Sequence, residues 1–301
     1  MIHWQFQPYA VPFRFPLHTA HGRWTVREGA IATLWDDSGQ RGQGEIAPVP
    51  WFGSETLGEA IALLQTLPPQ LTPQTIAAIP DHYPATQFAL ESAWLALQTH
   101  PPEIALKPEQ IAHLLPTGPA ALTTPIPPQT QTVKWKIGLT AVTEEIRWFR
   151  QLCTQLPPGV QIRLDANGGL TPDGLARWLE AAQTTGRVEL IEQPLKPDCI
   201  EDLLTWQARS PLPLALDESV AQIAQLEQWR AWGWQGVYVV KGAIAGFPSR
   251  LRQVCAGQNL DIIYSSVFET AVGRQNGLQL AQDIHNGDRA LGFGTVGWLA
   301  D

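Results

Sequence analysis

The feature that most constrains this chain is a short β-prone apolar run that ends in a polar or ionisable residue and recurs six times. Successive runs end 29, 27, 25, 24 and 24 residues apart, so each interval has room for one helix and two loops. Strands joined by crossover helices must run parallel, and repeated right-handed crossovers favour closure into a barrel. The carboxyl ends of the strands then face one mouth. The six terminal residues are Lys136, Asp165, Glu192, Asp217, Lys241 and Ser265.

The first 100 residues follow a different pattern, which predicts a small α+β domain. Three β-prone runs separated by turns indicate an antiparallel sheet, and two later stretches place apolar residues at helical spacing. The expected strands span 4–9, 30–35 and 42–46, and the expected helices span 55–67 and 84–99.

Residues 101–120 are rich in proline, threonine and alanine, which is typical of a linker. We therefore divide the chain into a domain at 1–100, a linker at 101–120 and a barrel at 121–301. A first barrel strand is expected near 121–126 and an eighth near 290–293. Only six residues then separate the first strand from the second, too few for a crossover helix, so we expect the first barrel helix to be missing.

Composition excludes several classes of function. A net charge of −8 and the absence of any Lys/Arg run argue against nucleic acid or an anionic membrane as the main partner. No apolar run reaches the roughly 18 residues of a membrane span, and no secretion signal is evident at the start. The three cysteines (Cys153, Cys199 and Cys255) have no metal-ligand spacing, and their odd number fits a reducing compartment. These observations predict a cytoplasmic protein.

Three carboxylates end three successive strands, at Asp165, Glu192 and Asp217. Hard oxygen ligands of this kind suit Mg²⁺, with Mn²⁺ as a possible substitute. A single aspartate at a strand end is more often a helix cap. Three in the same βα register are hard to explain as caps together, so we expect them to share a metal ion.

Two lysines, Lys134 and Lys136, are two residues apart and so lie on one face of their strand, while Trp135 points to the other. Adjacent ammonium groups and a nearby metal ion depress a lysine pKa, and a lysine shifted toward neutrality can act as a general base. Arg163 shares the face of Asp165 and adds positive charge. The alternative is that the two lysines are solvated surface residues.

Lys241 enters the mouth from the far side of the barrel, and its alternative role is an ion pair with Asp217 or Glu218. A metal ion that holds a substrate carboxylate, with a lysine beside the α-carbon, describes proton abstraction α to that carboxylate. The pattern therefore predicts an enzyme that acts on a small carboxylate.

The motifs in order resemble the muconate-lactonising subgroup of the enolase superfamily, and most closely the o-succinylbenzoate synthases. The resemblance covers nearly the whole chain, because residues 42–56 (GQGEIAPVPWFGSET) are similar to the capping domain of that subgroup. It implies a modified TIM barrel of the (β/α)7β type with an N-terminal α+β capping domain. The barrel motifs are VKWKIG at 133–138, RLDANGG at 163–169, IEQP at 191–194, LDES at 216–219, VVK at 239–241 and SSVFET at 265–270.

Carried over by position, the resemblance implies a magnesium site made by Asp165, Glu192 and Asp217. Lys136 would be the acid/base, Lys134 and Arg163 would tune and orient it, and Lys241 would stabilise an enediolate from the opposite face. Ser265 and Ser266 would line the substrate site, and loops around 15–24 and 50–54 would be lids. The implied reaction is a syn dehydration that yields o-succinylbenzoate on the way to menaquinone or phylloquinone. Gly242 departs from the pattern, because many relatives have proline there.

Other functions are also consistent with parts of this pattern. A Schiff-base aldolase also places a lysine at a strand end, but it does not need three matched carboxylates. A non-catalytic metal-binding scaffold would keep the carboxylates without needing the lysines. An N-acylamino-acid racemase or a dipeptide epimerase of the same superfamily shares both, although residues 289–301 lack the Asp-x-Asp pair associated with epimerases. The oligomeric state is not predicted.

Overall fold

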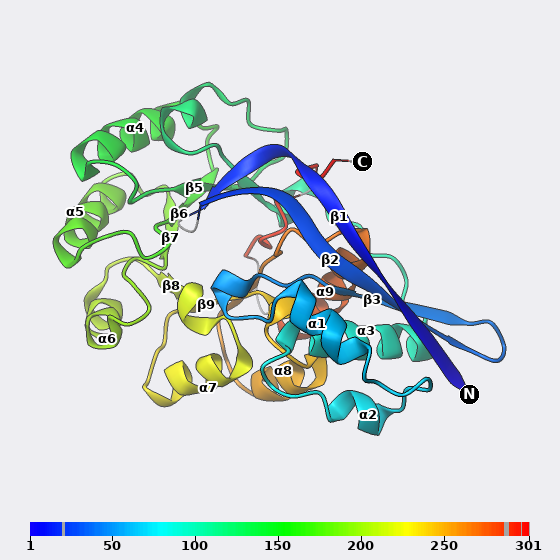
Figure 1. Cartoon of the computed structure of the whole chain (residues 1–301). Coiled ribbons are helices and arrows are strands. Elements are labelled where there is room, and N and C mark those ends of the chain that lie inside the picture. The colour runs from blue at the N-terminus through cyan, green and yellow to red at the C-terminus, as the bar shows by residue number, and fades with distance from the viewer. Residues whose placement is uncertain (20–21, 286–288, 296, 301) are drawn as a thin grey trace.

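A computed structural model describes residues 1–19, 22–285, 289–295 and 297–300. Its strands form two sheets, a three-stranded antiparallel sheet in the order β1-β2-β3 and a seven-stranded parallel sheet in the order β10-β9-β8-β7-β6-β5-β4 (Figure 1). Among the described residues, no helix is both long and apolar enough to cross a membrane. The predicted fold class, a modified barrel with an N-terminal α+β domain, is confirmed.

The barrel strands end where the sequence pattern places them. Three predicted terminal residues, Lys136, Asp165 and Glu192, are the last residues of their strands, and the other three follow directly after theirs. The strands are β5 (Thr132–Lys136), β6 (Gln161–Asp165), β7 (Val188–Glu192), β8 (Leu214–Leu216), β9 (Val237–Val240) and β10 (Ile262–Tyr264).

Helices occupy the intervals between these strands and lie outside them (Figure 1). The final helix, which packs beside β10, was not predicted. The helices are α4 (Val142–Gln155), α5 (Pro172–Gln183), α6 (Ile200–Arg209), α7 (Ile223–Ala231), α8 (Pro248–Cys255) and α9 (Ala271–Ile284).

The first strand differs from the prediction. It is β4 (Ala112–Leu114), inside the segment expected to be a linker, and it pairs with β5 through Ala112 and Thr132. Residues Gly118–Thr123 form a 3-10 helix instead of the expected strand, and Pro119 near its start suits a helical turn better than a sheet. No α-helix lies between β4 and β5 in the described chain, so the first barrel helix is missing, as expected.

The expected eighth strand is reduced to single bridges. Leu291 pairs in parallel with Ile111, and Gly292 pairs in parallel with Ser265. These bridges join both edges of the seven-stranded sheet to one segment, so the barrel closes at residues 291–292.

Strand alternation separates two packing layers. Trp135 faces the helices, where its ring lies 6.3 Å from Trp178 and is only 1% exposed. The barrel interior has its own small apolar cluster beneath the polar mouth, made by Leu190, Ala215, Val237, Val239 and Ile263. The residues that end these strands share the face of this cluster and therefore point into the barrel.

The N-terminal domain consists of β1 (Ile2–Thr19), β2 (Gly22–Asp36) and β3 (Arg41–Ile46) with α1 (Leu57–Leu64), α2 (Pro73–Ala77) and α3 (Pro84–Thr99). The first two strands form a longer hairpin than predicted. Helix α3 lies directly on β3, because Gly42 and Gly44 leave no side chain in the way. A Cβ at either glycine would collide with the backbone carbonyl of Ala93 or Ala89.

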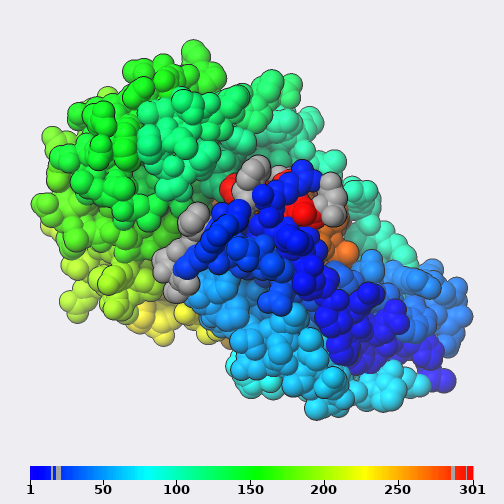
Figure 2. Space-filling view, turned by 45° about the horizontal axis from the view of Figure 1, so that its top comes forward, coloured from blue at the N-terminus to red at the C-terminus, as the bar shows by residue number. Residues whose placement is uncertain are grey.

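A buried carboxylate attaches this domain to the barrel. Glu45 at the end of β3 is 0% exposed and accepts hydrogen bonds from the backbone N–H groups of Thr270 (2.9 Å) and Gly273 (2.8 Å). It also accepts one from the Tyr9 hydroxyl at 2.5 Å. A carboxylate at this place satisfies the free N–H groups that start α9. Figure 2 shows the N-terminal domain in blue resting against the green barrel.

We predict that Glu45→Ala lowers the free energy of unfolding by about 3 kcal/mol, because it leaves several buried donors without a partner. Urea denaturation followed by circular dichroism measures this change. Glu59→Ala is the control, since Glu59 makes a similar cap on α1 but is exposed, and its effect should be smaller. Equal losses in the two variants would contradict a special role for Glu45.

Candidate active site

The predicted mouth residues come together at the carboxyl ends of the strands. Lys136 is paired in register with Asp165, and Asp165 with Glu192. Asp217 and Lys241 follow β8 and β9 on the same interior face. All three predicted ligands are buried, at 2% exposure each.

Two of the three lysines are held by carboxylates. The Lys134 ammonium lies 2.9 Å from Asp165 Oδ2 and 2.6 Å from Glu192 Oε1. On the other side of the mouth, the Lys241 ammonium forms an ion pair with Asp217 Oδ1. The alternative considered for Lys241, an ion pair with Asp217, is thus what the protein atoms form.

Lys136 differs from both of its neighbours. Among the described residues, its ammonium has no hydrogen-bond or ion-pair partner, although its charge is near enough to lower the pKa of Asp165. The half-buried Lys136 is therefore the one lysine of the mouth, within the described chain, whose nitrogen is not already committed to a carboxylate.

The pKa values of the carboxylates in the mouth are shifted by burial and by the neighbouring charges. Burial raises the pKa of Glu192 to about 8, and the neighbouring Asp165 and Asp217 add to the rise against the opposing effect of Lys134. Burial also acts to raise the pKa of Asp165, but the ammonium groups of Lys134, Lys136 and Lys241 outweigh it and lower the pKa. Three buried carboxylates share two paired ammonium groups, so one negative charge remains poorly compensated.

The prediction that Lys134 has a depressed pKa is not supported by these contacts. Burial favours the neutral amine, but Asp165, Glu192 and Asp217 together outweigh burial and raise the pKa of Lys134 above its usual value. The prediction treated Lys136 as the main charged neighbour of Lys134. The strand register places two carboxylates closer.

The donor set suits a hard divalent cation. The positively charged Lys134 ammonium lies between the carboxylates of Asp165 and Glu192. A metal cation bound by these two carboxylates would lie in a similar place. A fourth carboxylate, Glu218, has a buried oxygen without a hydrogen-bond partner among the described residues. Burial and the nearby Asp165 raise the pKa of Glu218, and Lys241 opposes the rise. No three acidic, histidine or cysteine side chains of the described residues already stand in coordination geometry. The carboxylates would have to exchange their ammonium partners for the metal ion.

Arg163, which was expected to tune and orient Lys136, lies in register with Lys134 but directs its hydrogen bonds elsewhere. Its guanidinium forms a two-bond ion pair with Glu189, at 2.8 Å and 3.1 Å, and is 2% exposed. A register shift between β6 and β7 brings Glu189 beside it. Arg289 continues the network by bonding both Glu189 and Asp261. Glu189 and Asp261 lie at the amino ends of β7 and β10, so the network closes the end of the barrel opposite the mouth.

The two serines have structural partners. Ser265 contacts the Gly292 carbonyl at 3.3 Å in the segment that closes the barrel. The Ser266 hydroxyl donates to Glu269 at 2.9 Å and accepts from the Phe268 N–H at 3.0 Å. Both serines are almost buried, at 8% and 6% exposure. Their predicted contact with substrate stays a prediction.

The N-terminal domain covers part of the mouth, as expected for the loop around 50–54. The Lys241 ammonium lies 4.2 Å from the centre of the Phe52 ring, and Gln222 donates to the Gly53 carbonyl. In the other expected lid, Trp24 packs against Trp51 and Phe268, while residues 20 and 21 lie outside the described chain. The contact between Phe52 and Lys241 was not predicted, because it joins two domains.

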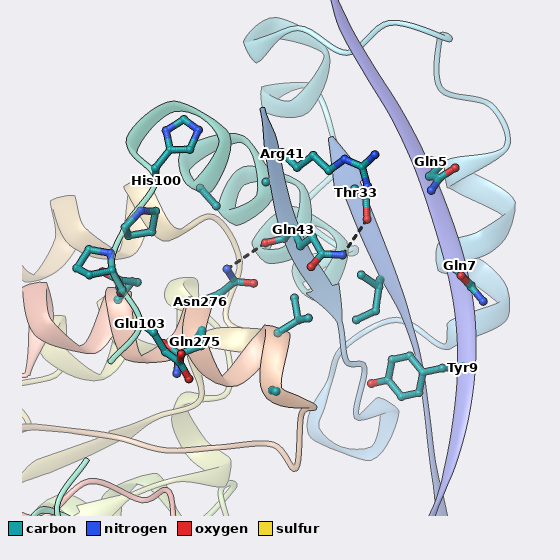
Figure 3. A pocket seen from close by; sticks show the side chains of 18 of the residues that line it. Gln5, Gln7, Tyr9, Thr33, Arg41, Gln43, His100, Glu103, Gln275 and Asn276 are labelled. Atoms are coloured by element: carbon teal, nitrogen blue, oxygen red, sulfur yellow. Dashed lines mark hydrogen bonds between the residues drawn. The ribbon is translucent and has the colours of Figure 1, made fainter. Parts of the chain in front are cut away.

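A groove of about 830 Å³ lies elsewhere, between the outer face of the N-terminal sheet and α9 (Figure 3). Its lining contains none of the predicted site residues and is rich in amides such as Gln5, Gln43 and Asn276. Tyr9 borders the groove, but its hydroxyl is bound to Glu45. Size alone therefore does not identify the active site, and the charge cluster at the mouth is the better candidate.

Comparisons with known proteins identify the family of the chain. Residues 128–287 match the family model described as enolase C-terminal domain-like, and residues 1–97 match the model described as MenC, N-terminal domain. The chain is 38% identical to o-succinylbenzoate synthase from Thermosynechococcus vestitus, over 99% of this chain and 94% of that protein. It is 29% identical to the o-succinylbenzoate synthase from Pectobacterium atrosepticum, over 88% and 81% of the two chains.

Solved structures give the same result. The crystal structure of o-succinylbenzoate synthase from Thermosynechococcus elongatus BP-1, with Mg in its active site, matches with a TM-score of 0.89 and 37% identity, over 99% of this chain and 94% of that one. The L-Ala-D/L-Glu epimerase from Bacillus subtilis matches with a TM-score of 0.81 over 99% and 90% of the two chains, but at 19% identity it shows the fold alone. The chain therefore belongs to the enolase superfamily and, within it, to the family of o-succinylbenzoate synthases.

Proposed function

We propose that this chain removes water from 2-succinyl-6-hydroxy-2,4-cyclohexadiene-1-carboxylate to give o-succinylbenzoate, a step toward menaquinone or phylloquinone. The observation that carries the proposal is the mouth itself, where Lys136 is paired in register with Asp165 and, among the described residues, its ammonium has no partner. Full-length similarity to o-succinylbenzoate synthases supports the choice of reaction. The substrate is a small carboxylate, and neither nucleic acid nor a membrane is required as a partner.

The proposed cofactor is Mg²⁺, held by Asp165, Glu192 and Asp217, with Mn²⁺ as a possible substitute. When bound, the cation would neutralise the substrate carboxylate and the negative charge that develops on it. Lys134, displaced from its two carboxylates, would remain beside them as a positive charge. The Mg in the related Thermosynechococcus enzyme supports this assignment.

Proton transfer is assigned to Lys136. In its neutral form it takes the α-proton, so the C–H bond breaks and its electron pair moves toward the carboxylate. The resulting ammonium then returns the proton to the departing hydroxyl as the C–O bond breaks, and water leaves. A single lysine can act in both steps only if proton and hydroxyl leave from the same face, so the elimination is syn.

Lys241 is proposed to stabilise charge from the opposite face without transferring a proton. Its contact with the Phe52 ring, 4.2 Å from the ring centre, supports a role beside a ring. A substrate ring there would gain cation–π attraction of about 0.5–2 kcal/mol when desolvated. A racemase differs in one respect, because lysines on both faces must exchange protons.

A turnover assay on the cyclohexadiene acid tests the reaction. We expect o-succinylbenzoate to form with Mg²⁺, formation to stop after chelation, and activity to return when Mg²⁺ is restored. The same protein is then incubated in D₂O with N-acylamino acids of both configurations. Rapid exchange of the α-hydrogen in both, without dehydration of the cyclohexadiene acid, would replace the synthase assignment by a racemase.

Lys136→Ala should fold and bind Mg²⁺ but lose about 10²–10⁴-fold in turnover, which is the usual contribution of a general acid/base. Steady-state kinetics measure the loss, and circular dichroism checks the fold. Lys107→Ala, at an exposed lysine outside the mouth, is the matched control and should behave as the unaltered protein. A Lys136→Ala variant with more than one tenth of normal turnover would remove this residue from the proton-transfer role.

Mg²⁺ affinity should depend on pH, because the ion must bind a deprotonated Glu192 whose pKa burial raises to about 8. Below that pKa a proton competes with the metal ion, so the dissociation constant should rise by up to about tenfold per pH unit. Titration calorimetry between pH 9 and pH 6 measures it. Glu192→Gln should bind more weakly but without this pH dependence, and a flat profile in the unaltered protein would contradict the prediction.

A cytoplasmic location is also proposed. Cys153, Cys199 and Cys255 are all free thiols. Unpaired cysteines fit a reducing compartment.

A further inference from the structure

One residue of the IEQP motif has no role in the reaction above but has a distinctive environment. Gln193 directly follows the proposed ligand Glu192 and is 0% exposed. Its backbone has φ of +35°, in the left-handed region that residues other than glycine seldom adopt. A residue held in this conformation within a buried site indicates that the surrounding contacts determine it strongly.

The side-chain amide of Gln193 is used completely. Its Nε2 donates to the Leu195 carbonyl (2.9 Å) and the Ser219 hydroxyl (2.8 Å). Its Oε1 accepts from the backbone N–H groups of Asp217 (2.9 Å) and Ser219 (3.2 Å). An amide has two donor hydrogens and two acceptor positions, so no hydrogen-bonding capacity remains. The side chain therefore ties the end of β7 to the end of β8.

The backbone around Gln193 extends this connection to β6. The Gln193 N–H donates to the Ala215 carbonyl at 2.7 Å, and the Gln193 carbonyl accepts from Gly168 at 2.7 Å. A second amide, Asn167, also has a positive φ and donates to Glu218 at 2.9 Å. The segment that carries Asp217 is thus fixed to both strands that carry the other two proposed ligands.

Electrostatics explain why such a tie is needed. Asp217 has neither a helical nor an extended backbone, with φ −125° and ψ −77°, and it is buried beside two other carboxylates. Repulsion between like charges at low dielectric pushes the segment after β8 away from the other ligands. The four hydrogen bonds of Gln193 oppose that displacement. They are made by neutral groups, so they add no competing ligand charge.

We propose that Gln193 is a positioning residue of the metal centre, which fixes Asp217 relative to Glu192 before the cation binds. It touches neither substrate nor metal ion. Its effect is to reduce the ordering that must accompany metal binding, in the way that groups behind metal ligands commonly act. The inference rests on the metal site of the proposed function.

The test is Mg²⁺ titration calorimetry on the full chain without substrate. Gln193→Met keeps the size and removes all four hydrogen bonds, and we expect its dissociation constant for Mg²⁺ to rise about 10–100-fold. Turnover should recover largely at saturating Mg²⁺, because the ligands and Lys136 are unchanged. Gln87→Met is the matched control, since Gln87 is a buried glutamine of α3 that bonds the Ile79 carbonyl away from the mouth.

Each outcome decides the inference. An unchanged dissociation constant in Gln193→Met, or an equal rise in Gln87→Met, would overturn it. If Gln193→Met does not fold, Ser219→Ala replaces it, because this change removes only one of the four bonds. A severalfold rise then supports the inference, and normal affinity overturns it. If the unaltered protein itself binds no Mg²⁺, the proposed metal site fails, which is a different result from failure of Gln193.

Discussion

Repulsion among three buried carboxylates is the physical constraint on which the rest of the structure depends. Asp165, Glu192 and Asp217 are each 2% exposed, so water cannot screen them. Within the protein they are compensated by Lys134 and Lys241, and burial, together with the neighbouring Asp165 and Asp217, still raises the pKa of Glu192. A site under this strain has a strong tendency to take up a cation. Lys136 forms no ion pair with a carboxylate among the described residues, although its charge helps to lower the pKa of Asp165.

Other buried carboxylates hold the loops around this cluster by binding backbone N–H groups. Glu145 accepts from Gly138, Leu139 and Thr140 just after β5, and Glu55 accepts from Ala85 and Thr86 where α3 begins. Charge-assisted bonds of this kind are about twice as strong as neutral ones. They turn loops into rigid supports, which is what a site needs if its charged groups are to keep their places.

Much of the fold could be predicted because local pattern and global topology agree. The alternation around Trp135 and the spacing of strand ends depend only on neighbouring residues, and the positions of Lys136, Asp165 and Glu192 followed from them. The first strand could not be found this way, since three residues at Ala112–Leu114 give almost no periodic signal. The ion pair of Arg163 could not be predicted for a related reason. Its face was predicted correctly, but its partner Glu189 depends on a register shift that one strand alone does not reveal.

The two domains differ in how far their contribution to the site can be predicted from the sequence. The barrel supplies the charged residues of the site, and the βα repeat allows their positions to be predicted from the sequence. The N-terminal domain supplies an aromatic surface, with Phe52 beside Lys241 and Trp24 against Phe268. These contacts join residues nearly two hundred positions apart or more, so no sequence period encodes them. An ammonium group is attracted by the face of an aromatic ring but repelled by another ammonium group. An aromatic ring from the N-terminal domain can therefore contact Lys241 without adding a charge to the site. The chemistry can therefore stay fixed in the barrel while the N-terminal domain varies the shape of the space around it.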